Sequence, residues 1–213
     1  MEPSNLKLNQ VEGSKLEAAK FIFKSSTLYA AFSAAFSMIG LLPFSEGFLP
    51  ERYVIGNPLE VSGISLEHLV GHIVFGLIVG VGTLKLRYFA LAGILPIALD
   101  ADHLIQFLEL EAVPRLGHSI AFALMAVPLT MYLMGKRDMI LGAVSFTAVF
   151  SHISFDILLG GTSAFPLFIL FQNKMTVYQG YDWVFFLLAA IVIVGVSTLL
   201  TKRMQPSKQS LRI

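Results

Sequence analysis

Long apolar runs recur along this chain, and short polar connections separate them. An α-helix rises 1.5 Å per residue, so about 20 consecutive apolar residues cross the hydrocarbon core of a bilayer. Runs near this length predict transmembrane helices at 27–44, 66–84, 88–108, 118–135, 139–160 and 183–201. We therefore expect an all-α protein, an integral membrane helical bundle of about six transmembrane helices. The first run is the weakest, because Ser33 and Ser37 dilute it and Pro43 ends it early.

The segments between and beside these runs complete the predicted organisation. The apolar part of 161–172 is too short to cross and is interrupted by Pro166, which predicts a re-entrant or interfacial elbow on the outer side. Gly and Pro punctuate residues 45–65, so this loop is also expected at the outer interface. We divide the chain into a cytoplasmic N-terminal tail at 1–26, a transmembrane domain at 27–201 and a basic cytoplasmic tail at 202–213. The first tail lacks the pattern of a secretory signal and is either solvated or, at 14–24, a short interfacial helix.

Composition supports a membrane protein and narrows the chemistry. The chain is 55% hydrophobic and 14% charged, with a mean hydropathy of +0.74, well outside the averages of soluble domains. A net charge of +1 provides no basic field, so nucleic acid is not expected as a substrate. The chain has no cysteine, so any metal ion must be held by histidines and carboxylates.

The positions of Lys and Arg predict the orientation in the membrane. Basic residues collect on cytoplasmic connections, and 12 of the 15 fall on one side if the N-terminus is cytoplasmic. The other side keeps Arg52, Arg115 and Lys174. We therefore expect a multi-pass protein of the plasma or inner membrane with both termini in the cytoplasm.

Aspartates and histidines within the predicted spans are the candidate functional residues, because an ionised carboxylate inside a bilayer needs a partner. They are His68, His72, Asp100, Asp102, His103, His118, His152 and Asp156. The pairs 68/72 and 152/156 are each four residues apart and so share one helix face, Asp100 and His103 are three apart on the third helix, and His118 opens the fourth. Counted from the span ends, all eight lie within roughly 12 Å of the outer boundary. Four helices would thus deliver them to one layer, which opens to the extracytoplasmic face.

A cluster of three aspartates and several histidines, with no Lys or Arg inside the span cores, predicts an anionic pocket that attracts cations. Divalent metal ions would neutralise the carboxylates, and two ions bridged by one aspartate would use all the ligands. Two alternatives stay open at this point: a metal-free proton or ion relay, and structural polar packing.

Four motifs in order carry a resemblance to a known family. The stretches "GHIVFG", "ALDADHL", "RLGHS" and "SHISFDILLGGTSAFPLF" resemble signatures of the membrane-bound metal-dependent hydrolases, also described as LexA-binding, inner-membrane-associated hydrolases. The match runs from about residue 66 to 172. More distantly, the order of ligands is similar to that of zinc-dependent phospholipases C and related nucleases. The chain departs from the family pattern around the fourth helix, where Gly117 replaces a threonine and Arg115 is shifted by one position.

The resemblance implies the roles of individual residues. It assigns metal binding to His72, Asp100, Asp102, His103, His118, His152 and Asp156. Within this set we expect Asp100, Asp102 and His118 to be the catalytic residues, and His68 and Arg115 are further candidates. The implied cofactor is a divalent metal, zinc being expected, with two ions.

These observations predict a membrane-bound metal-dependent hydrolase in which the metal centre activates water. The expected partners are the lipid bilayer and a lipid-linked or small phosphoester substrate, because two ions suit phosphoester cleavage and the site lies at headgroup depth. A competing hypothesis is a transporter or relay that passes protons or divalent metal through the same cluster. A third is a non-catalytic scaffold, for which substitution of the ligands would leave function intact.

Overall fold

The computed structural model describes residues 3–41, 53–54, 65–108, 112–113, 115–134, 137–169, 171 and 174–204. The α-helices of these residues are α1 (Pro3–Met38), α2 (Leu66–Gly80), α3 (Leu86–Leu99), α4 (Ile120–Leu133), α5 (Met139–Gly160) and α6 (Asp182–Met204). Short 3-10 segments are η1 (Ile39–Leu41), η4 (Val81–Thr83), η5 (Asp100–Leu108) and η6 (Leu116–His118). The strands are β1 (Tyr53–Val54), β2 (Ala112–Val113), β3 (Thr162–Phe165) and β4 (Thr176–Gln179).

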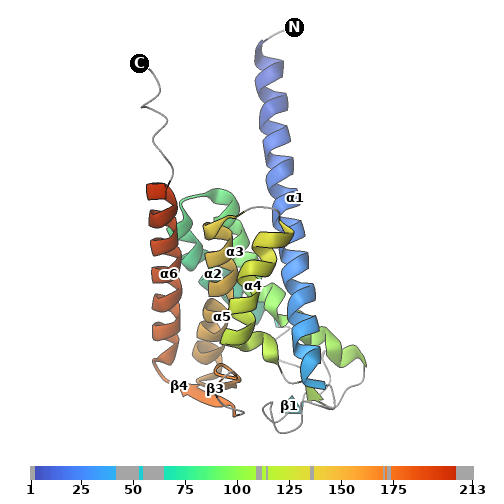
Figure 1. The fold of residues 1–213 in the computed structure, drawn as a ribbon, viewed down its shortest axis with the longest axis vertical. Coiled ribbons are helices and arrows are strands. Elements are labelled where there is room, and N and C mark those ends of the chain that lie inside the picture. The colour runs from blue at the N-terminus through green and yellow to red at the C-terminus, as the bar shows by residue number, and fades with distance from the viewer. Residues whose placement is uncertain are drawn as a thin grey trace.

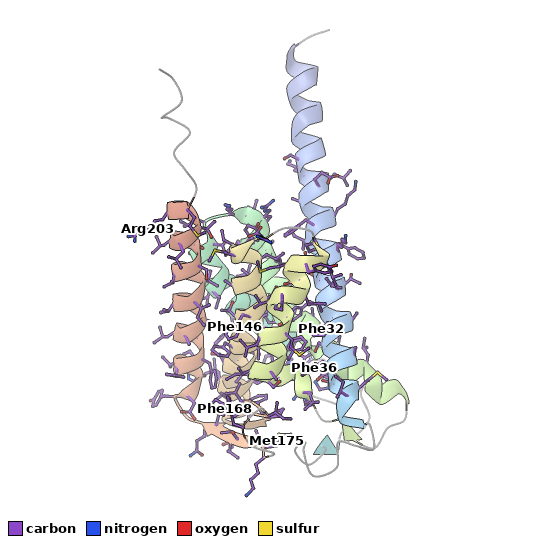
Figure 2. All side chains as sticks on the ribbon, viewed as in Figure 1. Phe32, Phe36, Phe146, Phe168, Met175 and Arg203 are labelled. Atoms are coloured by element: carbon purple, nitrogen blue, oxygen red, sulfur yellow. The ribbon has the colours of Figure 1, made fainter. Side chains whose placement is uncertain are left out.

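Helix α5 lies in the middle of the bundle and packs against α2, α3, α4 and α6 (Figure 1). The start of α1 extends beyond the other helices at the end where α6 finishes, and the β3–β4 hairpin lies at the opposite end (Figure 1). Aromatic rings join α1 to α4, because Phe32 and Phe36, labelled in Figure 2, contact Phe122 with centroids 5.1 and 5.6 Å apart. The end of the bundle with the β3–β4 hairpin can therefore be told apart from the end where α1 starts and α6 finishes.

Within the described residues, three helices are long and apolar enough to cross a membrane: Leu66–Thr83, which joins α2 to η4, together with α5 and α6. These coincide with three predicted spans, 66–84, 139–160 and 183–201. Helices α3 and α4 have 14 residues each, fewer than the roughly 20 that a span needs. The helical class is thus confirmed, and six complete spans stay a prediction.

The third predicted span, 88–108, is not one α-helix. Helix α3 ends at Leu99, and the backbone N–H of Asp100 donates to the Ile97 carbonyl, three residues back, instead of continuing the i to i−4 ladder. The chain then runs on as the 3-10 segment η5, so the "DADH" residues follow 3-10 geometry. His118 likewise lies in η6 and does not open the fourth helix, which Ser119 caps by accepting from the Phe122 N–H.

The expected elbow after the fifth span is a β-hairpin. Strands β3 and β4 pair antiparallel, with Thr162 opposite Gln179 and Phe165 opposite Thr176. Gly161, at φ +67°, ends α5 in a conformation that glycine adopts without strain. A second antiparallel pair joins β1 to β2. Short paired strands have too few residues for periodicity to reveal them, so the sequence predicted only a re-entrant or interfacial elbow.

Helix α1 runs without a break across residue 26, the boundary between predicted tail and predicted span. Its Ser25, Tyr29, Ser33 and Ser37 recur every four residues and are 0 or 1% exposed. This spacing puts them on one face, which packs against the bundle. The serines that weaken the first apolar run are therefore contact residues and do not face lipid.

Candidate metal centre

The predicted histidines and aspartates meet at one buried point in the bundle. They come from α2, from η5 and η6, and from α5. His72, His118 and His152 are fully buried, while the side chains of Asp100 and Asp156 are 11% and 9% exposed. Among the described residues, four overlapping groups of three could hold a metal ion, with the nitrogen and oxygen atoms of each group within 4.8 Å of one another: 68/72/156, 72/100/152, 118/152/156 and 100/102/103.

The two oxygens of Asp100 face different sets of imidazoles. Its Oδ2 lies 3.4 Å from His68 Nε2 and 3.8 Å from His72 Nε2. Its Oδ1 lies 3.3, 3.6 and 3.5 Å from the Nε2 atoms of His103, His118 and His152. Asp100 therefore stands between the α2 histidines and the other three.

Asp156 divides its oxygens in the same way. Its Oδ1 is 3.3 Å from His72 Nε2 and 3.6 Å from His68 Nε2, while its Oδ2 is 3.1 Å from His152 Nε2. Two carboxylates thus each offer one oxygen to the α2 pair of histidines and one to His152. A carboxylate that bridges two ions has this arrangement, with one oxygen for each.

The imidazole nitrogens also approach one another. His68 Nε2 and His72 Nε2 are 2.7 Å apart, and His118 Nε2 and His152 Nε2 are 2.9 Å apart. Two facing imidazole nitrogens at these distances cannot both carry a proton, so at least one of each pair directs a lone pair into the centre. Lone pairs that converge beside carboxylate oxygens are what a metal ion binds.

Backbone geometry on α2 brings His72 close to α5. A Cβ on Gly71 would lie 1.8 Å from the ring of Phe155, so only glycine leaves room for this ring. The Phe155 ring then packs edge-on against His72, with centroids 5.0 Å apart. The imidazoles of His72 and His152 stack at 3.9 Å, which aligns their Nε2 atoms toward the same aspartates.

The early end of α3 orients His152. The Nδ1 of His152 lies 2.8 Å from the carbonyl oxygen of Pro96. This carbonyl is available because the Asp100 N–H, its usual i+4 partner, bonds Ile97 instead. Since Nδ1 can donate here, Nε2 is left with its lone pair toward the carboxylates, as histidine ligands are commonly held.

Asp102 approaches His118 from the side of the ring that faces away from the shared centre. Its Oδ2 lies 3.6 Å from His118 Nδ1 and accepts a hydrogen bond from Ser37 Oγ at 3.1 Å. Ser37 Oγ in turn accepts from the Gly117 N–H at 3.0 Å. A Cβ on Gly117 would lie 2.5 Å from Ser33 Oγ, so the glycine lets α1 approach this closely. Helix α1 thereby reaches the centre through Ser37.

Arg115 supplies a positive charge that the span pattern did not place inside the bundle. Its Nη2 is 3.3 Å from Asp100 Oδ1 and 2.7 Å from His118 Nε2. The backbone of Arg115 has φ +46°, which a non-glycine residue rarely adopts and which is often found at functional sites. One guanidinium against three carboxylates still leaves the centre negative.

The β3–β4 hairpin covers one side of the centre. The Phe165 ring, 2% exposed, lies almost parallel to the His118 imidazole with centroids 5.8 Å apart. The Leu167 carbonyl accepts from the Ile120 N–H at 2.9 Å and ties the end of the hairpin to α4. The strands carry no charged residue, and burial raises the pKa of Tyr178, so its phenol stays neutral. The side chain that lies against His118 on this side is therefore apolar and uncharged.

Several buried polar atoms of the centre have no hydrogen-bond partner among the described residues. They are His68 Nδ1, His72 Nδ1, Asp100 Oδ2, Asp102 Oδ1, His118 Nδ1 and Asp156 Oδ1. Asp100 Oδ2 and Asp156 Oδ1 are the two oxygens that face the α2 histidines. Buried carboxylate oxygens without donors carry a large desolvation cost, which a cation between them would offset. The residues therefore fit a divalent metal.

The structure brings together all the predicted candidates, including His68 and Arg115. Sequence reasoning missed Ser37 and the Pro96 carbonyl, since neither residue type signals a role at a metal centre. No protein-family model matches the chain, and searches of curated proteins and of solved structures find no match either.

Proposed function

We propose that this chain is an integral membrane metal-dependent hydrolase whose dinuclear centre cleaves a phosphoester at headgroup depth. The observation that carries the proposal is that Asp100 and Asp156 each divide their oxygens between two sets of imidazoles. If these residues only packed as polar side chains, there would be no reason for both aspartates to divide their oxygens in the same way. Imidazole and carboxylate ligands suit zinc or manganese.

Charge supports the same proposal. Asp100, Asp102 and Asp156 bring three carboxylates, and Arg115 brings one positive charge. The excess negative charge is buried, where an uncompensated carboxylate is strongly unfavourable. Divalent ions provide the missing positive charge from outside the chain.

Each residue of the centre then has a role that follows from its contacts. When bound, divalent ions lower the pKa of a water molecule toward 7 and polarise a phosphoryl oxygen. Asp100 and Asp156 each contact the histidines of α2 through one oxygen and His152 through the other, and so hold these imidazoles close together. Asp102 acts through His118 Nδ1 and fixes the orientation of that ring, while Arg115 is placed to attract the negative charge of a phosphoester.

A lipid-linked substrate is favoured by the position of the centre. It lies near the hairpin end of the bundle, while Lys85, Arg137 and Arg203 lie at the other end. Basic residues collect on the cytoplasmic side, so the hairpin end would face outward. A centre at this level meets the headgroups of the outer leaflet.

A transporter of protons or divalent metal would need further ionisable groups along the bundle. In the part of the chain that the structure describes, the buried acidic and imidazole side chains all belong to this centre. Nearer the other end, the fully buried contact of Tyr29 Oη with the Ser145 carbonyl, at 2.9 Å, is neutral, and the charged pair of Arg87 and Asp138 is partly exposed. This favours hydrolysis over transport.

The test combines metal content with activity. Protein purified without added metal should carry about two equivalents of zinc or manganese by elemental analysis. It should hydrolyse a member of a panel of lipid phosphoesters, lose this activity to a chelator and regain it with metal. Asp100→Asn should lose both metal and activity, while the matched control Asp182→Asn, on the exposed start of α6, should keep both.

Two results would overturn the proposal. One is wild-type protein that is stable and metal-free. The other is proteoliposomes that conduct protons or zinc while every phosphoester stays intact, which would establish the transporter.

Orientation is tested at the two ends of the bundle, at the hairpin and at the end of α6. The absence of native cysteine allows single cysteines at Lys174 and Arg203, both exposed, to be probed on intact cells with a membrane-impermeant thiol reagent. We expect labelling at position 174 and protection at position 203. The reverse pattern would put the centre on the cytoplasmic face and remove the argument for an outer-leaflet substrate.

A further inference from the structure

A groove of about 500 Å³ lies far from the metal centre, where α1 passes the start of α3 and the end of α4. Its lining comprises Ser14, Glu17, Ala18, Lys20, Phe21, Lys24, Arg87 and Met134. Three of these residues are basic and one is acidic, and the acidic Glu17 is paired with Lys20 at 3.1 Å. The lining therefore carries a net charge of +2 beside an apolar wall.

Arg87 is held in place within this groove. Its guanidinium lies 5.3 Å from the centroid of the Phe21 ring and 4.5 Å from that of Tyr88. Its Nη2 is 3.8 Å from Asp138 Oδ2, and the Arg87 side chain stays 39% exposed. A fixed and partly exposed guanidinium suits a phosphate, which it can bind through two parallel hydrogen bonds.

Positive charge extends beyond the groove. Arg87 also lines an adjoining cavity of about 380 Å³ together with Lys85, Arg137 and Asp138. Lys202 and Arg203 lie in the last turn of α6, at the same end of the bundle, where Figure 2 labels Arg203. This end of the molecule therefore attracts anions over a wide area.

The same part of α1 also presents apolar side chains to its surroundings. Leu16 and Phe23 are 55% and 74% exposed and lie seven residues apart, on one face of the helix. Lys20 and Lys24 lie on the groove side. A helix with exposed apolar residues beside lysines is typical of a membrane interface, where the apolar residues enter the acyl region.

We infer that this groove binds the headgroup of an anionic phospholipid. The phosphate would lie against Arg87 and Lys24, and the start of an acyl chain would pack on Phe21 and Met134. The apolar wall and the exposed Leu16 and Phe23 favour a lipid over free phosphate, which needs neither. This inference does not depend on the proposed hydrolase activity.

The experiment titrates the full-length purified protein in detergent with phosphatidylglycerol, phosphatidylcholine or inorganic phosphate, and follows the thermal unfolding midpoint. We expect phosphatidylglycerol to stabilise the protein and the other two to have little effect. Lys24→Gln and Arg87→Gln should each weaken the apparent affinity for phosphatidylglycerol about fivefold, the usual contribution of one basic residue near an anionic surface. Lys174→Gln, at the opposite end, is the matched control and should bind as wild type does.

The outcomes separate the possible occupants. Equal stabilisation by phosphatidylcholine, or unchanged affinity in Lys24→Gln and Arg87→Gln, would overturn the inference. A full shift with inorganic phosphate would identify a phosphate site and also overturn it. If Arg87→Gln does not fold because its contact with Asp138 is lost, Lys24→Gln and the charge-retaining Arg87→Lys decide the question.

Discussion

Helices α5 and α6 have 22 and 23 residues, and both are apolar enough to cross a membrane, yet they differ in how much of each is buried inside the bundle. Within the apolar stretch of α5, 83% of the residues are buried in the bundle, against 22% for α6. The buried helix is the less apolar one and carries Ser145, Thr147, His152 and Asp156. A helix surrounded by protein can satisfy polar side chains, whereas a helix that faces lipid cannot. Greater hydropathy thus identifies the peripheral helix, and the candidate metal ligands lie on the other.

The largest expected effect concerns a candidate metal ligand on α5. His152→Ala removes an imidazole that contacts Asp100, Asp156 and His118. Loss of even an outer partner of a metal ligand costs about 10- to 100-fold, so we expect activity and metal affinity to fall more than about 100-fold. Metal titration and steady-state kinetics measure this. Ser197→Ala on α6 is the control, and similar behaviour of the two variants would remove the distinction between the helices.

The next effect concerns packing on α5. Ile153 is fully buried, and Ile153→Ala should lower the free energy of unfolding by about 3 kcal/mol because it leaves a cavity. Denaturation in a fixed detergent measures the change, with bound metal removed so that ligand affinity does not contribute. A loss below about 0.5 kcal/mol, the range of surface substitutions, would mean that α5 is not the packed centre of the bundle.

A smaller effect tests whether α1 supports the centre. Ser37→Ala removes the hydroxyl that joins Asp102 to the Gly117 N–H, which should weaken metal affinity about 10-fold. Ser37→Thr keeps the hydroxyl and should restore most of the affinity. If both variants bind metal as wild type does, Ser37 only packs α1 against the bundle.

The smallest effect is expected on α6. Val192 is 60% exposed, and Val192→Ala should change the free energy of unfolding by no more than about 0.5 kcal/mol. The measurement is the same denaturation experiment used for Ile153→Ala. A large loss would indicate that this face of α6 is covered by a partner or a second copy of the chain.

The sequence predicted the elements that depend on local composition. Spans 66–84, 139–160 and 183–201 agree with the observed helices to within three residues at each end. The stretches 88–108 and 118–135 contain shorter α-helices, because the backbone changes to 3-10 geometry at the "DADH" residues after α3, and because η6 and the Ser119 cap precede α4. Hydropathy measures how apolar a segment is and does not report where its hydrogen bonds change.

The residue types of the candidate centre were likewise visible in the sequence, since histidines and aspartates are unusual within apolar runs. The sequence did not show which of these residues contact one another. The contacts that orient the centre join residues far apart in the chain: Ser37 to Asp102 across 65 positions, and His152 to the Pro96 carbonyl across 56. Serines weakened the first apolar run when only local pattern was considered, yet in the folded bundle Ser37 contacts Asp102. Hydropathy and residue type are local properties of the chain, whereas the direction of a lone pair depends on which helices pack together, and only the tertiary structure decides that.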